Sequence, residues 1–520
     1  MFLKIVASAA VAVFAAACVE ANAAKPVPNI VLIYADDLGF GDVSCNGGSI
    51  DTPNIDGLAR EGLRFTDAHT SAATCTPSRF ALLTGQYAFR QRGTGILPGD
   101  ANLIISPDTV TLPKLLQWIA YDTGVVGKWH LGLGKDRIDW NGEIKPGPEK
   151  VGFGYHFVIA ATGDRVPCVY VEQNRVVGRE VGDPIAVSYS ERIDQGPSGA
   201  ERPDLLKQRW LQGHDQSIVN GISRIGWMTG GHRARWVDED MADVLTRKAV
   251  EFIDQCATAR SEFFLFFSTH DVHVPRAPHA RFAGKSGRGP RGDAVLQLDW
   301  CVGEVLAALD KRGLADDTLV IVTSDNGPVL DDGYRDQANE LLGDHDPNGP
   351  YRAGKYSLYE GGTRVPFIVR WPARVKPGRT SSALFGQVDL AASLAKLVDS
   401  PIPVGACGDS RNELDTLLGE DTTGRPHLVH EAGQRALRAG EWKFIPPGKA
   451  RDGMNPGQPK NVSKPGELYN VALDPGETTD LASQQPQQLR KMGELLAKIE
   501  VAPDGDVRQP SVSDLVLPIK

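Results

Sequence analysis

The stretch NIVLIYADD, residues 29–37, decides the fold class. A short apolar run, rich in β-branched residues, that stops at Asp36 and Asp37 is typical of a buried strand with two carboxylates at its C-terminal end. Similar runs occur at 123–126, 263–268, 318–324 and 365–370, and helix-period segments lie between them at 109–121, 238–255 and 293–312. This alternation predicts an α/β fold with a large, mostly parallel central sheet flanked by helices. In such sheets ligands bind beyond the carboxyl ends of the strands.

The composition of the chain and the length of its predicted elements change in its last part. After about residue 400 a Pro/Gly-rich passage precedes short strand candidates at 427–430, 436–438 and 442–445 and a final helix near 487–499. We therefore expect a catalytic domain at 24–400 and a smaller C-terminal α+β subdomain with an antiparallel sheet at 401–520. The basic segment 276–292 is broken by Gly and Pro, which predicts a surface loop.

Composition excludes several protein classes. The 520 residues are 23% charged and 41% hydrophobic, which excludes a disordered, collagen-like or coiled-coil protein. The formal net charge of −9 provides no overall field that would attract nucleic acid or an anionic membrane. An anionic substrate must therefore be held by a local cluster of cations, and we expect no nucleic-acid partner.

The N-terminus reads as an export signal. Lys4 precedes an apolar run at 5–17 and an Ala-x-Ala site at 21–23, and the run is too short to span a bilayer. This predicts a signal peptide at 1–23, no membrane span, and a periplasmic or secreted protein. Cys18 offers an alternative as a lipid-attachment site, although Ala15 stands where a larger aliphatic residue is usual. The other six cysteines are too scattered for a disulfide framework, which leaves one or two bridges open.

The segment CTPSR at 75–79 carries the strongest chemical signal. Pro77 suits the first turn of a helix, which places Cys75 at a helix N-terminus, where backbone N–H groups favour an anion. An exposed cysteine there should be reactive, and Arg79 returns to the same helix face. The alternative is a buried cysteine beside an ordinary surface arginine.

The pattern C-x-P-S-R-x-x-x-L-T-G resembles the signature of type I sulfatases of the alkaline phosphatase superfamily. In that family the cysteine is converted to 3-oxoalanine (formylglycine) by a formylglycine-generating maturation enzyme. Ala120 is a small departure, because the family usually has glycine there. Further motifs of the family follow in its order: Asp36-Asp37, GKWHLG at 127–132, HVP at 273–275, DNG at 325–327, Gly354-Lys355, YEGG at 359–362, and ELYN at 467–470.

Four oxygen donors stand at two of these motifs. Asp36, Asp37, Asp325 and Asn326 follow two predicted strands, and hard oxygen ligands favour Ca²⁺ or Mg²⁺ over zinc. The resemblance implies one Ca²⁺, with the group made from Cys75 also at the ion. Taken separately, the aspartate pair reads as a helix cap and the second motif as a turn.

The resemblance also implies catalytic roles. The aldehyde from Cys75 is hydrated to a gem-diol that attacks sulfur, and Arg79 holds the diol. Lys128 and Lys355 hold the sulfate oxygens. His130 assists release of the sulfate, and His273 protonates the leaving oxygen. His270 is the rival of His273, because it lies three residues earlier, although the His-x-Pro context favours His273.

The sequence says less about the rest of the substrate. A loop at 161–167 presents Asp164 and Arg165, which we expect to bind a sugar hydroxyl; an internal salt bridge is the alternative. The segment 226–236 combines two tryptophans with His232 and Arg233, the composition of either a sugar platform or a packed tryptophan pair. The basic residues of 276–291 line the pocket mouth or form a solvated loop.

Together these features predict an exported sulfuric ester hydrolase that removes sulfate from a sulfated carbohydrate. One alternative is a phosphate or phosphonate monoester hydrolase of the same superfamily. Another is a non-catalytic protein that binds sulfated glycans, which would apply if Cys75 were never converted.

Overall fold

The computed structural model describes residues 27–449 and 461–501. The predicted signal peptide at 1–23, Cys18 included, lies outside these residues. Among the helices that are described, none has both the length and the hydrophobicity needed to cross a bilayer. All six cysteines of the described residues are free thiols, so the chain has no disulfide between them.

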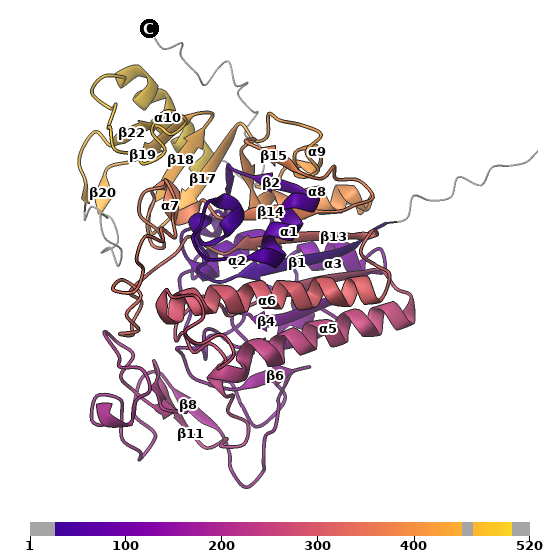
Figure 1. The fold of residues 1–520 in the computed structure, drawn as a ribbon, viewed down its shortest axis with the longest axis vertical. Helices are drawn as coiled ribbons and strands as arrows, with labels where there is room; N and C mark the ends of the chain where they lie inside the picture. The colour runs from indigo at the N-terminus through magenta and orange to yellow at the C-terminus, as the bar shows by residue number, and fades with distance from the viewer. Residues whose placement is uncertain (1–26, 450–460, 502–520) are drawn as a thin grey trace, which may run out of the picture.

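A central sheet of ten strands runs through the described part of the chain (Figure 1). Its four inner strands are parallel, as the apolar runs predict, and all their residues except the first of β4 are buried. The run at 365–370 differs, because its strand pairs antiparallel with β13. The sheet order is β15 (Arg379–Ser381), β2 (Leu63–Phe65), β14 (Phe367–Arg370), β13 (Thr318–Ser324), β1 (Asn29–Ala35), β12 (Phe263–Ser268), β4 (Asp122–Lys128), β5 (Tyr155–Ile159), β6 (Tyr170–Glu172) and β7 (Arg175–Val176).

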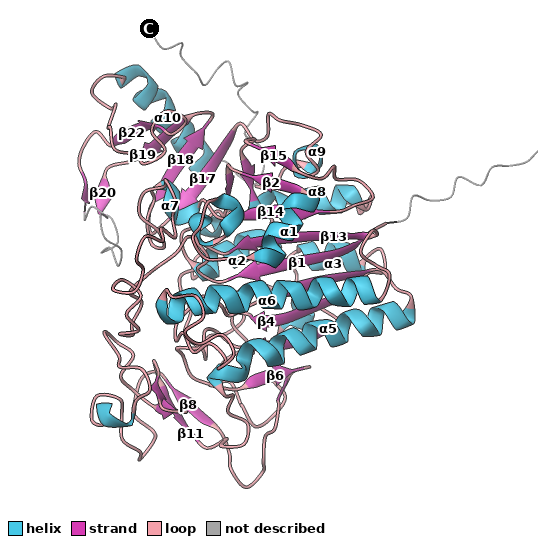
Figure 2. Cartoon of the chain, viewed as in Figure 1, coloured by secondary structure: helices cyan, strands magenta, loops and turns pink. Residues whose placement is uncertain are grey.

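Helices cover both faces of this sheet (Figure 2). One face carries α1 (Pro53–Glu61), α5 (Met241–Ala259) and α6 (Gly289–Lys311), which pack against one another. The other carries α2 (Cys75–Thr84), α3 (Leu112–Gln117) and α8 (Leu390–Leu397). The core between the layers is one continuous apolar cluster. The mostly parallel α/β sheet predicted from the sequence is therefore present.

The basic segment 276–292 is a loop over residues 276–288, as its glycines and prolines predict, but several of its charges are used within the fold. Helix α6 begins at Gly289, inside that segment. Arg276 and Arg291 are buried. Nη1 of Arg276 lies 2.8 Å from Asp336 Oδ2, and Nη1 of Arg291 lies 2.6 Å from Asp42 Oδ1. Two further arginines of the segment are also ion-paired, Arg281 with Asp243 and Arg288 with Asp344. These charges are used within the fold, because ionic partners far away in the sequence reach them.

A smaller antiparallel sheet follows the central one, as predicted (Figure 1). Its strands are β17 (His427–Glu431), β18 (Arg435–Ala439), β19 (Trp442–Ile445) and β22 (Glu467–Asn470), and α10 (Pro486–Val501) packs on it. Short elements elsewhere are β3 (Ala68–His69), β8 (Ala186–Ser188), β9 (Ile218–Val219), β10 (Ile222–Ser223), β11 (Trp227–Thr229), β16 (Phe385–Gly386), β20 (Gly448–Lys449), β21 (Asn461–Val462), α4 (Pro148–Val151), α7 (Glu360–Thr363) and α9 (Leu414–Leu417).

The small sheet also supports the segment that leads into α2. The Glu431 amide at the end of β17 donates to the Ser71 carbonyl at 3.0 Å, and the Glu431 carbonyl accepts from the Ala73 amide at 2.8 Å. On the other side, the Tyr356 amide donates to the Ala73 carbonyl at 2.8 Å. The approach to Cys75 is thus fixed by residues about 280 and 360 positions further along the chain.

Candidate active site

Four neighbouring strand ends form the floor of the site. Asp36 and Asp37 follow β1, Asp325 and Asn326 follow β13, Lys128 ends β4, and the 269–273 segment follows β12. Parallel strands end at the same edge of a sheet, so these side chains meet there. Close packing fixes the edge: a Cβ on Gly127 would lie 1.8 Å from the Ser268 carbonyl oxygen, and its φ of +109° also favours glycine.

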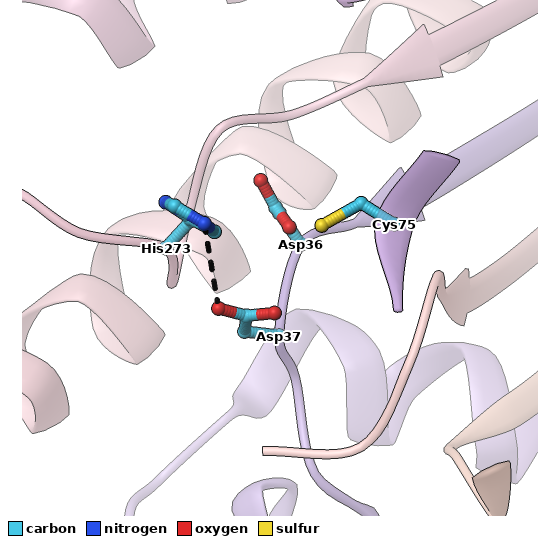
Figure 3. A group of neighbouring side chains, drawn as sticks. All are labelled: Asp36, Asp37, Cys75 and His273. Atoms are coloured by element: carbon cyan, nitrogen blue, oxygen red, sulfur yellow. Dashed lines mark ion pairs between the residues drawn. The ribbon is translucent and has the colours of Figure 1, made fainter. Parts of the chain in front are cut away.

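Three of the predicted ligands, Asp36, Asp37 and Cys75, converge at this edge together with His273 (Figure 3). One side-chain donor atom from each of Asp36, Asp37, Cys75 and His273 lies within 4.8 Å of the others, and all four residues are buried. Asn326 joins them, because its Nδ2 donates to Asp37 Oδ1 at 2.7 Å. The structure thus brings together two aspartate-containing motifs about 290 residues apart in the sequence.

Two lysines face these carboxylates. Lys128 Nζ lies 2.6 Å from Asp36 Oδ2 and 3.6 Å from Asp325 Oδ2. Lys355 Nζ lies 2.9 Å from Asp37 Oδ2. Burial opposes the charge of each lysine, but the neighbouring carboxylates raise the pKa of both above the ordinary value. Two permanent cations therefore lie within the cluster, where they can hold an anionic group.

Cys75 begins helix α2 but is not exposed. Only 2% of its surface is accessible, and burial raises the pKa of its thiol to about 12 although Lys128 and Lys355 lower it. The expectation of an exposed, reactive thiol is therefore wrong for the unmodified residue. The desolvation of the sulfur outweighs the helix N-terminus and the lysines.

Arg79 turns from α2 toward the carboxylates, as its position one turn after Cys75 predicts. Its guanidinium donates to Asp325 Oδ2 from Nη2 at 2.7 Å and to the Lys128 carbonyl from Nη1 at 3.0 Å, and it also bonds Ser268. The side chain is fully buried. These contacts make Arg79 a brace between α2, β13 and β4.

The donor set fits a hard divalent cation. Asp36 Oδ1 and Asn326 Oδ1 are buried and have no hydrogen-bond partner in the described part of the chain. Burial and Asp325 raise the pKa of Asp36 well above its ordinary value, and burial likewise raises the pKa of Asp37. Crowded carboxylates with unused oxygens are what Ca²⁺ or Mg²⁺ binds in proteins.

The two histidines after β12 have different partners. His270 Nε2 accepts the Gly163 amide at 3.1 Å, so this nitrogen is already used. His273 Nδ1 lies 2.6 Å from the Val274 carbonyl, which leaves Nε2 directed at the cluster, 3.8 Å from Asp37 Oδ2 (Figure 3). Burial, reinforced by Lys355 and Lys128, lowers the pKa of His273. The geometry therefore favours His273 over His270 as the histidine whose side chain acts at the cluster.

His130 lies on the turn after β4 with a φ of +55°. Its Nε2 contacts the Leu97 carbonyl at 3.0 Å, and its own carbonyl accepts from Thr76 at 3.1 Å. Its Nδ1 is buried without a hydrogen-bond partner among the described residues. The contact with Thr76 places His130 beside the residue that follows Cys75.

A second group of polar side chains lies beside the cluster. Asp164 pairs with Arg165, with Nη1 2.9 Å from Oδ1, and its Oδ2 lies 2.9 Å from His214 Nε2. Asp332 Oδ2 lies 2.8 Å from Lys355 Nζ. Sequence reasoning singled out Asp164 and Arg165 but missed His214 and Asp332. Neither belongs to a motif, so only the fold shows that they reach the site.

His232 and Arg233 have no described contact with the cluster. Their side chains are 74% and 77% exposed, and they pair with Asp183 and Glu180. Trp236 is buried, and Arg192 stacks over the Trp227 ring at 5.0 Å from its centroid. The two tryptophans thus have different neighbours, because Trp236 packs against Tyr170 and Trp227 is half-buried beneath Arg192.

A further set of potential metal ligands, His69, Glu360 and His430, is buried between the two sheets. Glu360 already faces Lys443 at 3.0 Å and Arg438 at 3.4 Å. Glu360 is the single carboxylate of this set and also faces Arg364 at 3.6 Å, so three cations already neutralise it, and we read the set as an ion-pair network that joins the sheets.

Comparisons with known proteins agree with this geometry. A sequence model of the family described as Sulfatase matches residues 28–400. An N-acetylgalactosamine-6-O-sulfatase of Bacteroides thetaiotaomicron is 52% identical over 482 residues, which cover 91% of this chain and 93% of that protein. Human arylsulfatase A is 33% identical over 497 residues, covering 91% and 87%.

Solved structures of similar proteins have the same fold. One, from work on the metabolism of multiple glycosaminoglycans by Bacteroides thetaiotaomicron, superposes with a TM-score of 0.88 at 50% identity and covers 92% of this chain and 100% of that chain. Another, Ps i-CgsB in complex with k-i-k-neocarrahexaose, has a TM-score of 0.68 at 25% identity and covers 93% and 94%.

Proposed function

This chain belongs to the sulfatase family, and from that premise we propose that it hydrolyses the 6-O-sulfate ester of N-acetylgalactosamine in a sulfated carbohydrate. The convergence of Cys75 with Asp36, Asp37 and His273 carries the proposal for the reaction, because it joins a nucleophile position, an ion site and a proton donor. The 52% identity to an N-acetylgalactosamine-6-O-sulfatase over nearly the whole chain supports the choice of sugar.

Two groups would complete the site. Asp36, Asp37, Asp325 and Asn326 would hold one Ca²⁺, which would draw charge from the sulfate oxygens. Formylglycine made from Cys75 would supply, in its hydrated form, the hydroxyl nucleophile that attacks sulfur. The buried thiol with a pKa of about 12 would be a poor nucleophile itself, which is consistent with its conversion.

The lysines would bind the sulfate group. Lys128 and Lys355 are charged and buried, and each already faces an aspartate, so their positions are fixed before substrate arrives. Fixed cations in a dry site stabilise the charge that builds up on the sulfuryl oxygens without a cost of reorganisation. Arg79 acts here as a positioning residue through its contacts with Asp325 and the Lys128 carbonyl.

His273 would protonate the leaving sugar oxygen from Nε2. The bond from Nδ1 to the Val274 carbonyl fixes the ring and keeps Nε2 facing the cluster. A bound sulfate anion would offset the repulsion from Lys355 and Lys128 that lowers the pKa of His273. His130, whose Nδ1 has no hydrogen-bond partner among the described residues, would serve as the base that assists release of the sulfate.

Asp164 and Arg165 would bind the sugar itself. Asp164 offers a carboxylate acceptor; it is held by Arg165 and by His214. We include in the proposal that the chain is exported through its N-terminal segment and that a formylglycine-generating enzyme acts on it. The division into a catalytic domain at 24–400 and a C-terminal subdomain at 401–520 is also part of the proposal.

Sulfate release from monosaccharides tests the sugar. We expect hydrolysis of N-acetylgalactosamine 6-sulfate and at most slow hydrolysis of the 4-sulfate and of N-acetylglucosamine 6-sulfate. A preference for either of the latter two would overturn the substrate proposal, and faster release of phosphate from the matching 6-phosphate would favour a phosphomonoesterase.

The mass of the peptide that contains Cys75 tests the nucleophile. Conversion of the thiol to an aldehyde lowers the mass by about 18 Da. An unmodified thiol in active protein from the native host would exclude the proposed chemistry, and an unmodified thiol in inactive protein that still binds the sugar would leave a glycan-binding function.

A further inference from the structure

A short two-stranded ribbon lies against the wall of the site. Trp210 and Tyr334 pair across it; the Leu211 amide donates to the Gly333 carbonyl at 2.7 Å, and the Arg335 amide donates to the Arg209 carbonyl at 2.8 Å. Tyr334 is fully buried, and its ring centroid lies 4.8 Å from that of His214. The ribbon therefore packs directly on a residue that contacts Asp164.

The same ribbon continues into the sulfate end of the site. Asp332, whose Oδ2 lies 2.8 Å from Lys355 Nζ, stands three residues before Arg335. Three residues span at most about 10 Å of backbone. The backbone of Arg335 therefore lies within about 10 Å of that of Asp332, the residue that contacts Lys355.

The side chains on the outer face of the ribbon are two arginines. Arg209 and Arg335 stand opposite each other on antiparallel strands, and both are exposed. Like charges directly opposite across such a pair destabilise it. Within residues 27–449 and 461–501, neither guanidinium has an ion pair or a hydrogen bond to an acidic side chain.

Several other exposed arginines of the described residues do have acidic partners. Arg192 pairs with Glu201, Arg202 with Asp204, and Arg233 with Glu180. The ribbon thus places two exposed positive charges, which have no acidic partner among the described residues, opposite each other on neighbouring strands. An anion held between the guanidinium groups would relieve their repulsion.

We propose that Arg209 and Arg335 form a second anion site, which binds an acidic group on a sugar next to the one that loses its sulfate. Guanidinium groups bind planar carboxylates and sulfate oxygens through paired N–H donors, so the ligand is a carboxylate or a second sulfate ester. This inference rests on the proposed function, and it makes the physiological substrate a polyanionic oligosaccharide rather than a single sulfated sugar.

Kinetics of the R209Q/R335Q double variant test the site. The substrates are N-acetylgalactosamine 6-sulfate, a disaccharide that adds a hexuronic acid to it, the same disaccharide with its carboxyl group reduced, and the reduced form with a second sulfate. For the acidic disaccharide we expect kcat/KM to fall about tenfold, mainly through KM, because a rim contact binds ground and transition states alike. The monosaccharide and the singly charged reduced disaccharide should be unaffected.

The disulfated substrate identifies the acidic group, and a variant at another arginine controls for the loss of positive charge. A loss confined to the uronate assigns a carboxylate site, whereas a loss with the disulfated sugar as well assigns a general anion site. Arg312→Gln serves as the control, because Arg312 is an exposed arginine at the end of α6 that pairs with Asp254. It should leave every substrate unchanged.

The outcomes separate this inference from the proposed function. If wild type hydrolyses the monosaccharide and the double variant keeps full kcat/KM on both doubly charged substrates, the second site is refuted alone. If wild type hydrolyses none of the sugars, calorimetry with a hexasaccharide of alternating hexuronic acid and N-acetylgalactosamine 6-sulfate still decides. The affinity for the hexasaccharide is compared between Cys75→Ala and the same protein with R209Q/R335Q added. Equal affinities refute the second site, and an affinity about tenfold weaker in the triple variant upholds it.

Discussion

Arg79 and Asp325 form a fully buried ion pair in which one carboxylate oxygen accepts two guanidinium donors, Nη2 at 2.7 Å and Nε at 3.0 Å. The pair ties the first turns of the helix that begins at Cys75 to the end of strand β13. Both residues also contact Lys128. Arg79 donates to the Lys128 carbonyl, and Asp325 Oδ2 lies 3.6 Å from Lys128 Nζ. One contact thus orients parts of the nucleophile segment, the ion ligands and a sulfate-binding lysine.

Arg79→Lys should destabilise the protein although it keeps the charge. A lysine cannot make the paired contact with Asp325 and also reach Ser268 and the Lys128 carbonyl. We expect the free energy of unfolding to fall by about 1–3 kcal/mol, measured by urea unfolding followed by circular dichroism. Arg312→Lys, at an exposed pair, should show no measurable change. Equal effects of the two substitutions would contradict a bracing role for Arg79.

Asp36→Asn should separate ion binding from folding. Burial and Asp325 raise the pKa of Asp36, so a neutral side chain is tolerated there, but one anionic ligand is lost. We expect calcium affinity, measured by calorimetry, to fall about 10–100-fold, with the apo protein still folded. Calcium should raise the melting temperature of wild type much more than that of the variant.

Asp204→Asn, an exchange at an exposed acid, is the control for this experiment. Unchanged calcium affinity in Asp36→Asn would place the ion elsewhere. Treatment of wild type with a chelator should abolish sulfate release, and added Ca²⁺ should restore it.

His273→Asn should affect substrates according to their leaving group. Loss of the proton donor should lower kcat by about 10²–10⁴-fold for a sugar sulfate, whose alkoxide leaves poorly, and far less for an aryl sulfate with an acidic phenol. The ratio of the two kcat values is the measurement. His270→Asn should lower both rates together, because His270 Nε2 accepts the Gly163 amide. If His270→Asn changes the ratio and His273→Asn does not, the two assignments must be exchanged.

Asp164→Ala should cost activity on the sugar but little on a small aryl sulfate. The carboxylate lies among sugar-binding candidates, held by Arg165 and His214, and makes no described contact with the ion ligands. We expect kcat/KM for N-acetylgalactosamine 6-sulfate to fall about tenfold or more. Equal losses on both substrates would show that Asp164 supports the site instead of reading the sugar.

Asp271→Asn should change how stability depends on pH. Burial raises the pKa of Asp271 to about 7, although Gln297 donates to its carboxyl group at 2.9 Å. Between about pH 4 and pH 7 the folded state keeps a proton that the unfolded state has lost, so this group's contribution falls as pH rises and is lost above pH 7.

The asparagine does not titrate. Relative to wild type, Asp271→Asn should therefore gain stability between pH 4 and pH 8, by about 4 kcal/mol at most. Urea unfolding at several pH values measures the difference, and Asp399→Asn, at a side chain 88% exposed, is the control. A constant difference between variant and wild type across this range would refute a titrating Asp271.

The sequence predicted the sheet well because its inner strands are buried on both faces and therefore appear as uninterrupted apolar runs. The predicted ranges of β1, β12 and β13 agree with the structure residue for residue. The direction of β14 was not predictable, since the same apolar run suits either direction. The loop at 276–288 was predicted, but the start of α6 at Gly289 and the burial of Arg276 and Arg291 were not, because their partners Asp336 and Asp42 lie far from them in the sequence.

The site was predictable where motifs carry it and not elsewhere. The positions of Asp36, Asp37 and Cys75 followed from strand ends and a helix start. The burial of Cys75 did not, because the groups around it, such as Asp36, Lys128 and Lys355, come from parts of the chain that only the fold brings together. The pairing of His214 with Asp164 spans 50 residues without a motif, so only the folded chain shows it.

The bonds from Glu431 to Ser71 and Ala73 also form late in biosynthesis. The strand that encloses the cysteine leaves the ribosome some 350 residues after the cysteine itself, which at about 5–20 residues per second is a delay of tens of seconds. Until then the segment that leads to Cys75 lacks the two backbone bonds that hold it in the folded protein. The proposed conversion of Cys75 would therefore have to come before this strand docks, and a chain that folded without it would keep its thiol.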